Sequence, residues 1–445
     1  MKPIRFAPDV FFRLTPNKDV ILYKTSLQKV FLLDGGIYKL LSYTRQSSDP
    51  SQILALINSG TQSITKEEFD QTILQLIELG ILLPEVSLEE RKRTLESTVK
   101  MSQYDSVNAL FSVQFELTFR CNEHCRHCYC PRENDIKSEL STDEIKHIID
   151  DLREMNVVDL TFTGGDLFMR KDTFEILEYA YSLGFTINIF TNGTLLKDDD
   201  FYRIKKLYPR SVHFSIYNYI PEKHDAFTQL PGSFKKTTDA IKKCKLLGIP
   251  INIKVSLLDE NYNDVEGIIK LAEELGTTIQ ISLQITPTNE GGMESTKHRL
   301  NSAKMYAEIM KKIDRKILLS CEGDFVSLEK NRHKSALCGA GAFSLNINPY
   351  GEVFPCNALL LSCGNVRKSS IKEIWNNSET LERVRNFTLN QLKGCENCKD
   401  KYYCDFCPGS AMQETGDPLM RYSEACTLTE AKIIKRKEID SNVTH

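Results

Sequence analysis

Cysteine is the residue type whose number and spacing could support chemistry in this chain. Four of the 14 cysteines lie in RCNEHCRHCYC, which runs from Arg120 to Cys130, and nine more lie between Cys321 and Cys426. A disulfide scaffold would need roughly 8–10% cysteine, far more than this chain has. Clustered thiols in a long chain bind metals more often than they form disulfides. The sequence therefore predicts metal-dependent chemistry.

Two kinds of metal site are compatible with the first four thiols. A structural zinc site would use Cys121, Cys125, Cys128 and Cys130 together. An iron–sulfur cluster held by three thiolates would leave one iron without a protein ligand, open to a small molecule. The thiols alone do not decide between these sites, so the surrounding segments must.

Cys121-x3-Cys125-x2-Cys128 resembles the cluster motif of the radical S-adenosylmethionine (SAM) superfamily. TFTGGDLFMR (161–170) resembles the GGE motif of that family, with Asp166 where glutamate is usual. The resemblance implies a [4Fe–4S] cluster whose open iron binds SAM, and a 5′-deoxyadenosyl radical that abstracts hydrogen. The expected SAM contacts are His127, Thr163, Gly164, Gly165, Asp166, Asn192, Ser215 and Lys254.

Alternating strands and helices must position these segments. The expected strands are 113–119, 157–164, 186–192, 211–218, 251–258 and 279–286, with helical stretches between them. Near-continuous apolar strands joined by helices predict a parallel sheet that the crossover helices cover. Six such units predict an incomplete barrel, a partial (β/α)6 TIM-like fold over residues 113–315. Chemistry in such folds lies at the carboxyl ends of the strands, where the cysteine and glycine motifs fall.

Seven cysteines near the C-terminus form a second pattern, Cys338-x12-Gly351-x4-Cys356, then Cys395-x2-Cys398-x5-Cys404-x2-Cys407, then Cys426. It resembles the SPASM domain, although x3 is more usual before Cys407. The resemblance implies two auxiliary [4Fe–4S] clusters in residues 316–445, three clusters in total. The first would use Cys338, Cys356, Cys407 and Cys321, and the second Cys395, Cys398, Cys404 and Cys426. Cys363 or an open substrate position could replace Cys321, and two zinc sites are the alternative to both clusters.

Residues 1–95 predict a small α+β, winged-helix-like domain, with strands at 10–15, 20–25 and 29–34 and then three helices. The domain resembles the PqqD-like leader-peptide recognition element of peptide maturases, in which an extended leader adds as a strand. A DNA-binding winged helix is the alternative. The net charge of −3 argues against nucleic acid. Residues 96–112 would form a linker.

The whole chain thus resembles a radical SAM SPASM peptide maturase. The resemblance implies a thioether (sactipeptide or ranthipeptide type) or carbon–carbon crosslink in a ribosomally made precursor peptide, with electrons from a flavodoxin or ferredoxin. A maturase of a folded protein (sulfatase-activating type), a peptide epimerase and a zinc-binding regulator are alternatives. No apolar run reaches the roughly 18 residues of a membrane span, and a cytoplasmic enzyme without membrane partners is expected. Asp259, Glu260 and Glu290 are equivalent candidates for a general base.

Overall fold

The chain divides into two compact units. The first ends at residue 109 and includes residues 180–186, and the second is formed by the remainder. The computed structural model describes residues 4–7, 10–14, 20–24, 29–33, 36–44, 47–59, 63–84, 110–130, 138–313 and 337–443. In these segments every helix is too short or too polar to cross a bilayer.

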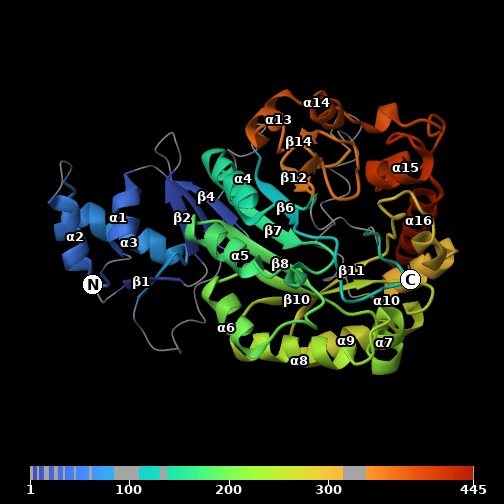
Figure 1. Cartoon of the computed structure of the whole chain (residues 1–445), viewed down its shortest axis with the longest axis horizontal. Helices are drawn as coiled ribbons and strands as arrows, with labels where there is room; N and C mark the ends of the chain where they lie inside the picture. The colour runs from blue at the N-terminus through green and yellow to red at the C-terminus, as the bar shows by residue number, and fades with distance from the viewer. Residues whose placement is uncertain are drawn as a thin grey trace. The chain divides into compact units, whose positions relative to one another are not determined.

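The N-terminal unit contains a three-stranded antiparallel sheet in the order β2-β3-β4, followed by three helices (Figure 1). The elements are β2 Val10–Leu14, β3 Val20–Lys24, β4 Lys29–Leu33, α1 Ile37–Thr44, α2 Pro50–Asn58 and α3 Lys66–Glu78. All six were expected from the sequence. A short antiparallel pair, β1 (Ile4–Phe6) with β5 (Leu82–Pro84), was not predicted.

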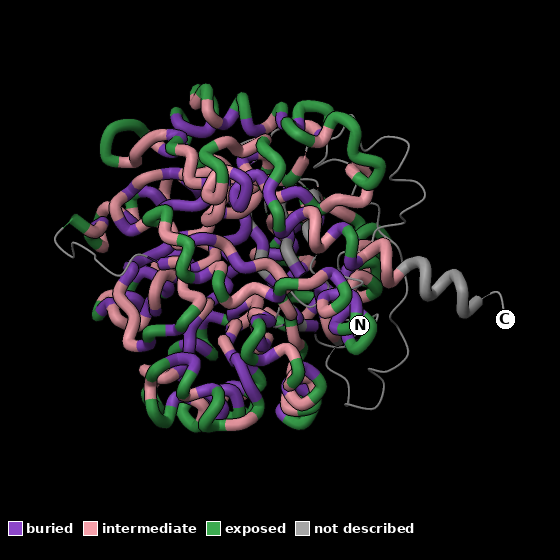
Figure 2. The backbone as a smooth tube through the Cα atoms, turned by 90° about the vertical axis from the view of Figure 1, so that its right-hand side faces the viewer, coloured by how far each residue is buried: buried purple, intermediate pink, exposed green. Residues whose placement is uncertain are grey.

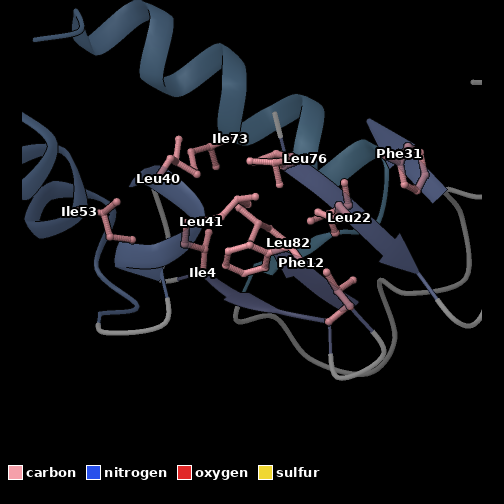
Figure 3. Close-up of a cluster of buried hydrophobic side chains, with 14 of the residues drawn as sticks. Ile4, Phe12, Leu22, Phe31, Leu40, Leu41, Ile53, Ile73, Leu76 and Leu82 are labelled. Carbon is pink, nitrogen blue, oxygen red and sulfur yellow. The ribbon is translucent and has the colours of Figure 1, made fainter. Parts of the chain in front are cut away.

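The core of this unit lies between the sheet and the helices, where Phe12, Leu22, Leu41 and Ile73 converge (Figure 3). Helix α3 contributes its apolar side to this core. It begins at a capping box, in which the Thr65 hydroxyl accepts from the Glu68 amide and the Glu68 carboxylate accepts from the Thr65 amide. The unit therefore has its own buried core.

The larger unit is built on a sheet with the order β11-β10-β9-β8-β7-β6-β12-β13-β14. Six consecutive parallel strands, each beside the next in sequence, make the expected (β/α) arrangement. Their bounds are β6 Ser112–Glu116, β7 Asp159–Thr163, β8 Thr186–Thr191, β9 Ser211–Ser215, β10 Ile251–Ser256 and β11 Thr278–Ser282. Most of these strands end two to four residues earlier than predicted, where the chain enters the loops that carry the motifs.

Helices cover one side of this sheet (Figure 1). They are α4 Thr142–Glu154, α5 Thr173–Ser182, α6 Asp198–Lys206, α8 Ser233–Leu246 and α9 Val265–Leu275. Helix α4 begins at a capping box of Ser141 and Glu144 and buries Ile145, Ile148, Ile149 and Leu152. Buried and exposed residues alternate along these helices, as amphipathic helices on a sheet require (Figure 2).

The strands of this sheet are apolar mainly on one face. Val113, Phe115, Phe162 and Phe214 lie on the helix-covered face, and the Phe115 and Phe162 rings stack at 5.5 Å. The alternate positions are largely polar: Gln114, Glu116, Asp159, Thr161, Asn188, His213, Ser215, Asn252 and Lys254. A strand has a period of two, so these residues share the opposite, inner face. The inner face is therefore built for polar contacts.

An antiparallel hairpin follows in the chain, formed by β12 (Ser344–Ile347) and β13 (Glu352–Phe354). Strand β12 also pairs in parallel with β6 and extends the barrel sheet, which was not predicted. The hairpin is followed by β14 Gly364–Asn365, α13 Ile371–Asn377, α14 Glu379–Arg385, α15 Pro408–Thr415 and α16 Ser423–Val443. Helix α7 (Pro221–Thr228) follows β9, and α10 (Ala303–Lys312) follows β11.

Candidate active site

The cysteine loop leaves the carboxyl end of β6 and turns back at Cys125, whose carbonyl accepts from the Cys128 amide at 3.1 Å. Cys125 is buried, and Cys121 and Cys128 are half-buried. Cys125 and Cys128 pack in one apolar cluster with Tyr217, Phe227 and Leu258, among others. The three expected cluster ligands therefore share one short loop over the end of the sheet.

The electrostatic environment of these thiols opposes ionisation in the absence of a cation. Burial raises the pKa of Cys121 to about 12 and raises that of Cys125 well above its usual range. Nearby acidic groups, Glu123 and Asp166 among them, add to the effect on Cys121. Ionised thiolates in this loop therefore need positive charge beside them, which the iron ions of a cluster would supply.

Cys130 is placed differently from the other three. It is buried, and its thiol donates to the Gly164 carbonyl at 3.7 Å. A hydrogen bond with Cys128 and burial raise its pKa well above the usual value. Its thiol is thus engaged with the glycine turn of β7.

Gly164 and Gly165 allow the turn after β7 to lie directly against the cysteine loop. Gly164 has φ +148°, and a Cβ there would lie 2.2 Å from the Thr118 carbonyl oxygen. A Cβ on Gly165 would lie 2.4 Å from the Arg120 carbonyl oxygen. Backbone bonds join the two segments, from the Gly165 amide to Thr118 and from the Asp166 amide to Arg120. The glycines are required by this close approach of two backbones.

Asp166 is 0% exposed, and its carboxylate is fully occupied by the protein. One oxygen accepts from the Phe168 amide at 3.0 Å, and the other from the Thr191 hydroxyl at 2.7 Å and the Asn192 amide at 2.9 Å. Burial raises its pKa, and these hydrogen bonds oppose the rise. The shorter acid in the GGD segment therefore joins the ends of β7 and β8.

Asn192 continues this network toward the cysteine loop. Its side-chain NH2 donates to Asn122 at 2.9 Å and approaches the Cys121 sulfur at 3.8 Å. Its side-chain oxygen accepts from the Thr194 amide and hydroxyl. Thr163, the last residue of β7, is paired with Glu116 across the sheet. The structure thus brings together the cysteine loop, the glycine turn and Asn192.

His127 lies in an aromatic group above the sheet. Its ring centroid is 4.9 Å from that of Tyr217 and 5.1 Å from that of Phe227. Burial lowers its pKa to about 4, so the ring is neutral at pH 7. Its Nδ1 is buried with no hydrogen-bond partner among the described residues. This aromatic, apolar setting suits contact with another planar ring.

Ser215 and Lys254 are paired neighbours on β9 and β10, and both are half-buried on the inner face. The Lys254 ammonium lies 3.6 Å from the Phe190 ring centroid. Burial lowers the pKa of Lys254 to about 8. The inner face therefore offers a cation beside a hydroxyl, a combination suited to a carboxylate.

Several of the C-terminal thiols lie within electrostatic range of one another, and Cys395, Cys404 and Cys407 pack against one apolar cluster. Burial raises the pKa of Cys356 to about 11. Two backbone hydrogen bonds oppose this rise, and the neighbouring Cys407 and Cys338 add to it. Burial also raises the pKa of Cys404, and the neighbouring Cys426 and Cys395 add to that rise. Cys426 accepts from the Arg421 guanidinium at 3.1 Å, and Cys398 and Cys395 also lie within electrostatic range of Arg421.

The fourth ligand of the first set stays a prediction, because Cys321 lies outside the described residues. Its rival Cys363 is buried, and its thiol donates to the Leu361 carbonyl at 3.5 Å. No three His, Cys, Asp or Glu side chains in the described segments converge as a single-ion site would require. Cluster ligands bind separate irons, so spaced thiols fit clusters in their donor chemistry.

Sequence reasoning missed Glu116, a buried carboxyl on the inner face of β6. The signal was present, because VQFELTF alternates apolar and polar residues and Glu116 lies at one of its polar positions. Of the three candidate bases, Glu260 contacts the His298 ring, and Asp259 and Glu290 are exposed.

Sequence models of two known families match the chain. The model of the radical SAM superfamily matches residues 115–272, and that of the iron–sulfur cluster-binding domain SPASM matches residues 338–399. The first range contains the cysteine loop and the glycine turn. The second contains Cys338, Cys356, Cys395 and Cys398, while the remaining thiols of the pattern follow it.

The chain is similar to several characterised proteins. It is 29% identical over 338 residues to the AdoMet-dependent heme synthase of Methanosarcina barkeri, covering 70% of this chain and 95% of that protein. It is 26% identical over 303 residues to the antilisterial bacteriocin subtilosin biosynthesis protein AlbA of Bacillus subtilis, covering 67% of this chain and 66% of that protein. It is 27% identical over 297 residues to the PqqA peptide cyclase of Xanthomonas oryzae pv. oryzae, covering 64% of this chain and 79% of that protein.

Solved structures share the fold. Streptococcus suis SuiB, bound to the precursor peptide SuiA, superposes with a TM-score of 0.60 at 14% identity, covering 95% of this chain and 99% of that one. The anSMEcpe structure with bound AdoMet superposes with a TM-score of 0.56 at 15% identity, covering 75% of this chain and 98% of that one. The two family matches, together with the cysteine loop at the end of β6, show that residues 115–272 form a radical SAM domain and that residues 338–399 belong to a SPASM iron–sulfur domain.

Proposed function

We propose that the protein modifies a ribosomally synthesised precursor peptide by forming a thioether or a carbon–carbon crosslink. The observation that carries the proposal is the extent of the SuiB match, which covers 95% of this chain. That protein was solved with a precursor peptide bound. Two relatives in sequence are also named for peptide products, AlbA for subtilosin and the PqqA cyclase for its peptide.

The barrel residues fit the binding of SAM and its cluster. Cys121, Cys125 and Cys128 would hold the cluster, and Cys130 would stay bonded to the glycine turn. The aromatic group around His127 would receive the adenine, and Lys254 with Ser215 the methionine carboxylate. When bound, SAM supplies a radical that removes a hydrogen atom from a substrate carbon. The cysteine loop excludes bulk water from this position, because Cys125, Tyr217 and Phe227 are buried there.

Two further clusters would occupy the C-terminal thiol groups, for a total of three. An external reductant such as a flavodoxin or ferredoxin would supply electrons, and we expect a cytoplasmic setting with no nucleic acid or membrane partner. Anaerobic reconstitution should therefore give about 12 iron and about 12 sulfide ions per chain. Zinc in place of iron would contradict the proposal.

The N-terminal unit would recognise the leader of the peptide. Its sheet has two edge strands, β2 and β4, and an extended peptide can add to such an edge through main-chain hydrogen bonds. The unit would act as a PqqD-like, winged-helix-like domain over residues 1–95, joined by 96–112 to a barrel of 113–315 and a SPASM domain of 316–445.

The test is an anaerobic assay with dithionite, SAM and a synthetic precursor peptide, followed by mass spectrometry. We expect formation of 5′-deoxyadenosine and a peptide product that has lost two hydrogen atoms. An epimerase would leave the mass unchanged. Absence of 5′-deoxyadenosine under all reducing conditions would overturn the proposal.

A second candidate function follows from the similarity to the heme synthases. That alignment covers 95% of the Methanosarcina barkeri protein yet leaves 30% of this chain unmatched. Part of this chain therefore has no counterpart there, whereas SuiB covers nearly all of it. Stimulation of 5′-deoxyadenosine formation by an iron porphyrin, and by no peptide, would favour the second candidate.

A further inference from the structure

Glu116 lies at the carboxyl end of β6, in the sheet position next to Thr163. Its neighbour Phe115 stacks on Phe162 at the helix-covered face. The strand alternates, so the Glu116 side chain projects from the inner face. It is therefore directed toward the side of the sheet that carries Ser215 and Lys254, at the end where the cysteine loop begins.

The carboxyl group of Glu116 is 3% exposed and only half satisfied. Its Oε2 accepts from the Asn346 side chain of β12 at 2.9 Å. Its Oε1 is buried and has no hydrogen-bond partner among the described residues. A buried carboxyl oxygen without a partner is costly, so such an atom points to a ligand or a proton.

Two other buried carboxylates of this unit have both oxygens bound by the protein. Asp159 accepts from Asn188 and Arg210. Asp166 binds two amides and a hydroxyl. Glu123 of the cysteine loop and Glu424 of α16 each also have one oxygen without a partner among the described residues. Glu116 differs from these two in its position on the inner face of β6, at the carboxyl end of the strand.

The surroundings of Glu116 bring the pKa of its carboxyl close to neutral pH. Burial raises its pKa to about 7, and the bond from Asn346 opposes the rise. The titratable groups that face it are the Tyr129 phenol and the Cys130 thiol of the cysteine loop. Burial raises the pKa of Tyr129, and a hydrogen bond with Cys128 raises that of Cys130, so both stay neutral near pH 7. A group with these properties suits proton transfer at neutral pH.

We propose that Glu116 is the proton acceptor of the bond-forming step, through its Oε1. The inference rests on the proposed function. Closing a carbon–sulfur bond on a substrate carbon that has lost a hydrogen atom requires that the thiol also lose its proton and that one electron leave. The S–H bond breaks, the C–S bond forms, the proton passes to Glu116, and the electron passes to an oxidised iron–sulfur cluster. In a carbon–carbon crosslink, the proton comes from the attacked carbon.

The test is Glu116→Gln in the reconstituted holoenzyme, with the ratio of crosslinked peptide to 5′-deoxyadenosine as the readout. Glutamine keeps an acceptor for Asn346 but cannot take a proton. Hydrogen abstraction should continue, while the ratio falls by about 10²-fold, a typical contribution of a general base. In the wild type the ratio should rise as pH increases through about 7, where the carboxylate forms, and the variant should show no such rise.

Two controls separate this role from a structural one. Glu116→Asp should restore part of the ratio, because a carboxylate is present. Asp159→Asn changes a buried inner-face carboxylate at the opposite end of the strands and should leave the ratio unchanged. An undiminished ratio in Glu116→Gln would overturn the inference while leaving the proposed function intact. A wild-type enzyme that forms no peptide product would overturn both, and an equal loss of iron and of 5′-deoxyadenosine in Glu116→Gln would assign the residue to structure.

Discussion

The two ends of the barrel's inner face differ in how they treat buried carboxylates. At the amino end, both oxygens of Asp159 accept from Asn188, and one also accepts from the Arg210 guanidinium at 3.1 Å. At the carboxyl end, Glu116 Oε1 is buried with no partner in the described segments. Asn188 and Asn252, nearer the amino end, also have unpartnered amide oxygens, so the contrast lies in the carboxylates.

This difference separates the roles of two carboxylates within one sheet. An unpaired buried polar atom costs about 1–3 kcal/mol, so the Glu116 carboxyl is a local cost for the chain alone. In parallel barrels the carboxyl ends of the strands carry the active site. We infer that Asp159 contributes to the free energy of unfolding and Glu116 to turnover. The Asp166 network, also at the carboxyl end, contributes to stability because both oxygens of its carboxylate are bonded to the protein.

The largest effect is expected at the cysteine loop. Cys128→Ala removes one of three ligands of the proposed cluster and should reduce 5′-deoxyadenosine formation to the level of metal-free protein. Cys130→Ala should retain most of the activity, because that thiol is bonded to the Gly164 carbonyl. Anaerobic activity and iron content check both variants. Equal losses in the two variants would contradict the division of the four thiols.

Asp166→Asn should have the next largest effect. The substitution turns an acceptor into a donor opposite the Thr191 hydroxyl and the Asn192 amide, which should lower the free energy of unfolding by about 2–4 kcal/mol. Asp166→Glu, the residue usual in the family, must fit another methylene into a fully buried position, at about 1–3 kcal/mol. Urea denaturation measures both. An unchanged midpoint in Asp166→Asn would show that the network does not join the strands.

Lys254→Met should weaken SAM binding by about tenfold, the loss of about 1.4 kcal/mol of charge attraction. Burial lowers the pKa of Lys254 to about 8, so the ammonium form is present below pH 8 and lost above it. Wild-type affinity should therefore fall between pH 7 and pH 9, and the variant should not follow. Calorimetry on the reconstituted enzyme tests this, with the exposed Lys242→Met as control. A parallel pH response in Lys254→Met would assign the dependence to another group.

The smallest effect on turnover is expected from Asp159→Asn at the amino end. It weakens a partly buried ion pair with Arg210 and should cost about 1–2 kcal/mol of stability. Turnover per folded molecule should stay unchanged. Thermal unfolding and the anaerobic assay, run on one preparation, check both statements. A loss of turnover without a loss of stability would show that the two ends are not independent.

The strands and helices could be predicted because their signals are local. Periodic apolar residues and capping boxes, such as Thr65 with Glu68, depend on neighbours a few residues away. The polar inner face was not recognised, although Glu116 and Lys254 lie at the polar positions of alternating strands, because which face of a strand turns inward depends on the whole sheet. The commitment of Asp166 to Thr191 and Asn192 also escaped prediction, since it depends on loops from two strands. Pairing of β12 with β6 joins positions that no local pattern relates.

That last pairing sets an order of events during synthesis. Asn346 contacts Glu116 across 230 residues of chain. At about 5–20 residues per second, the ribosome needs roughly 10–50 s after making β6 before it releases β12. Until then the β6 edge is unpaired and open to other chains, a recognised route to aggregation. If the clusters are inserted after the C-terminal hairpin has formed, the β6 edge is already paired with β12. We therefore expect maturation factors to act after translation rather than during it.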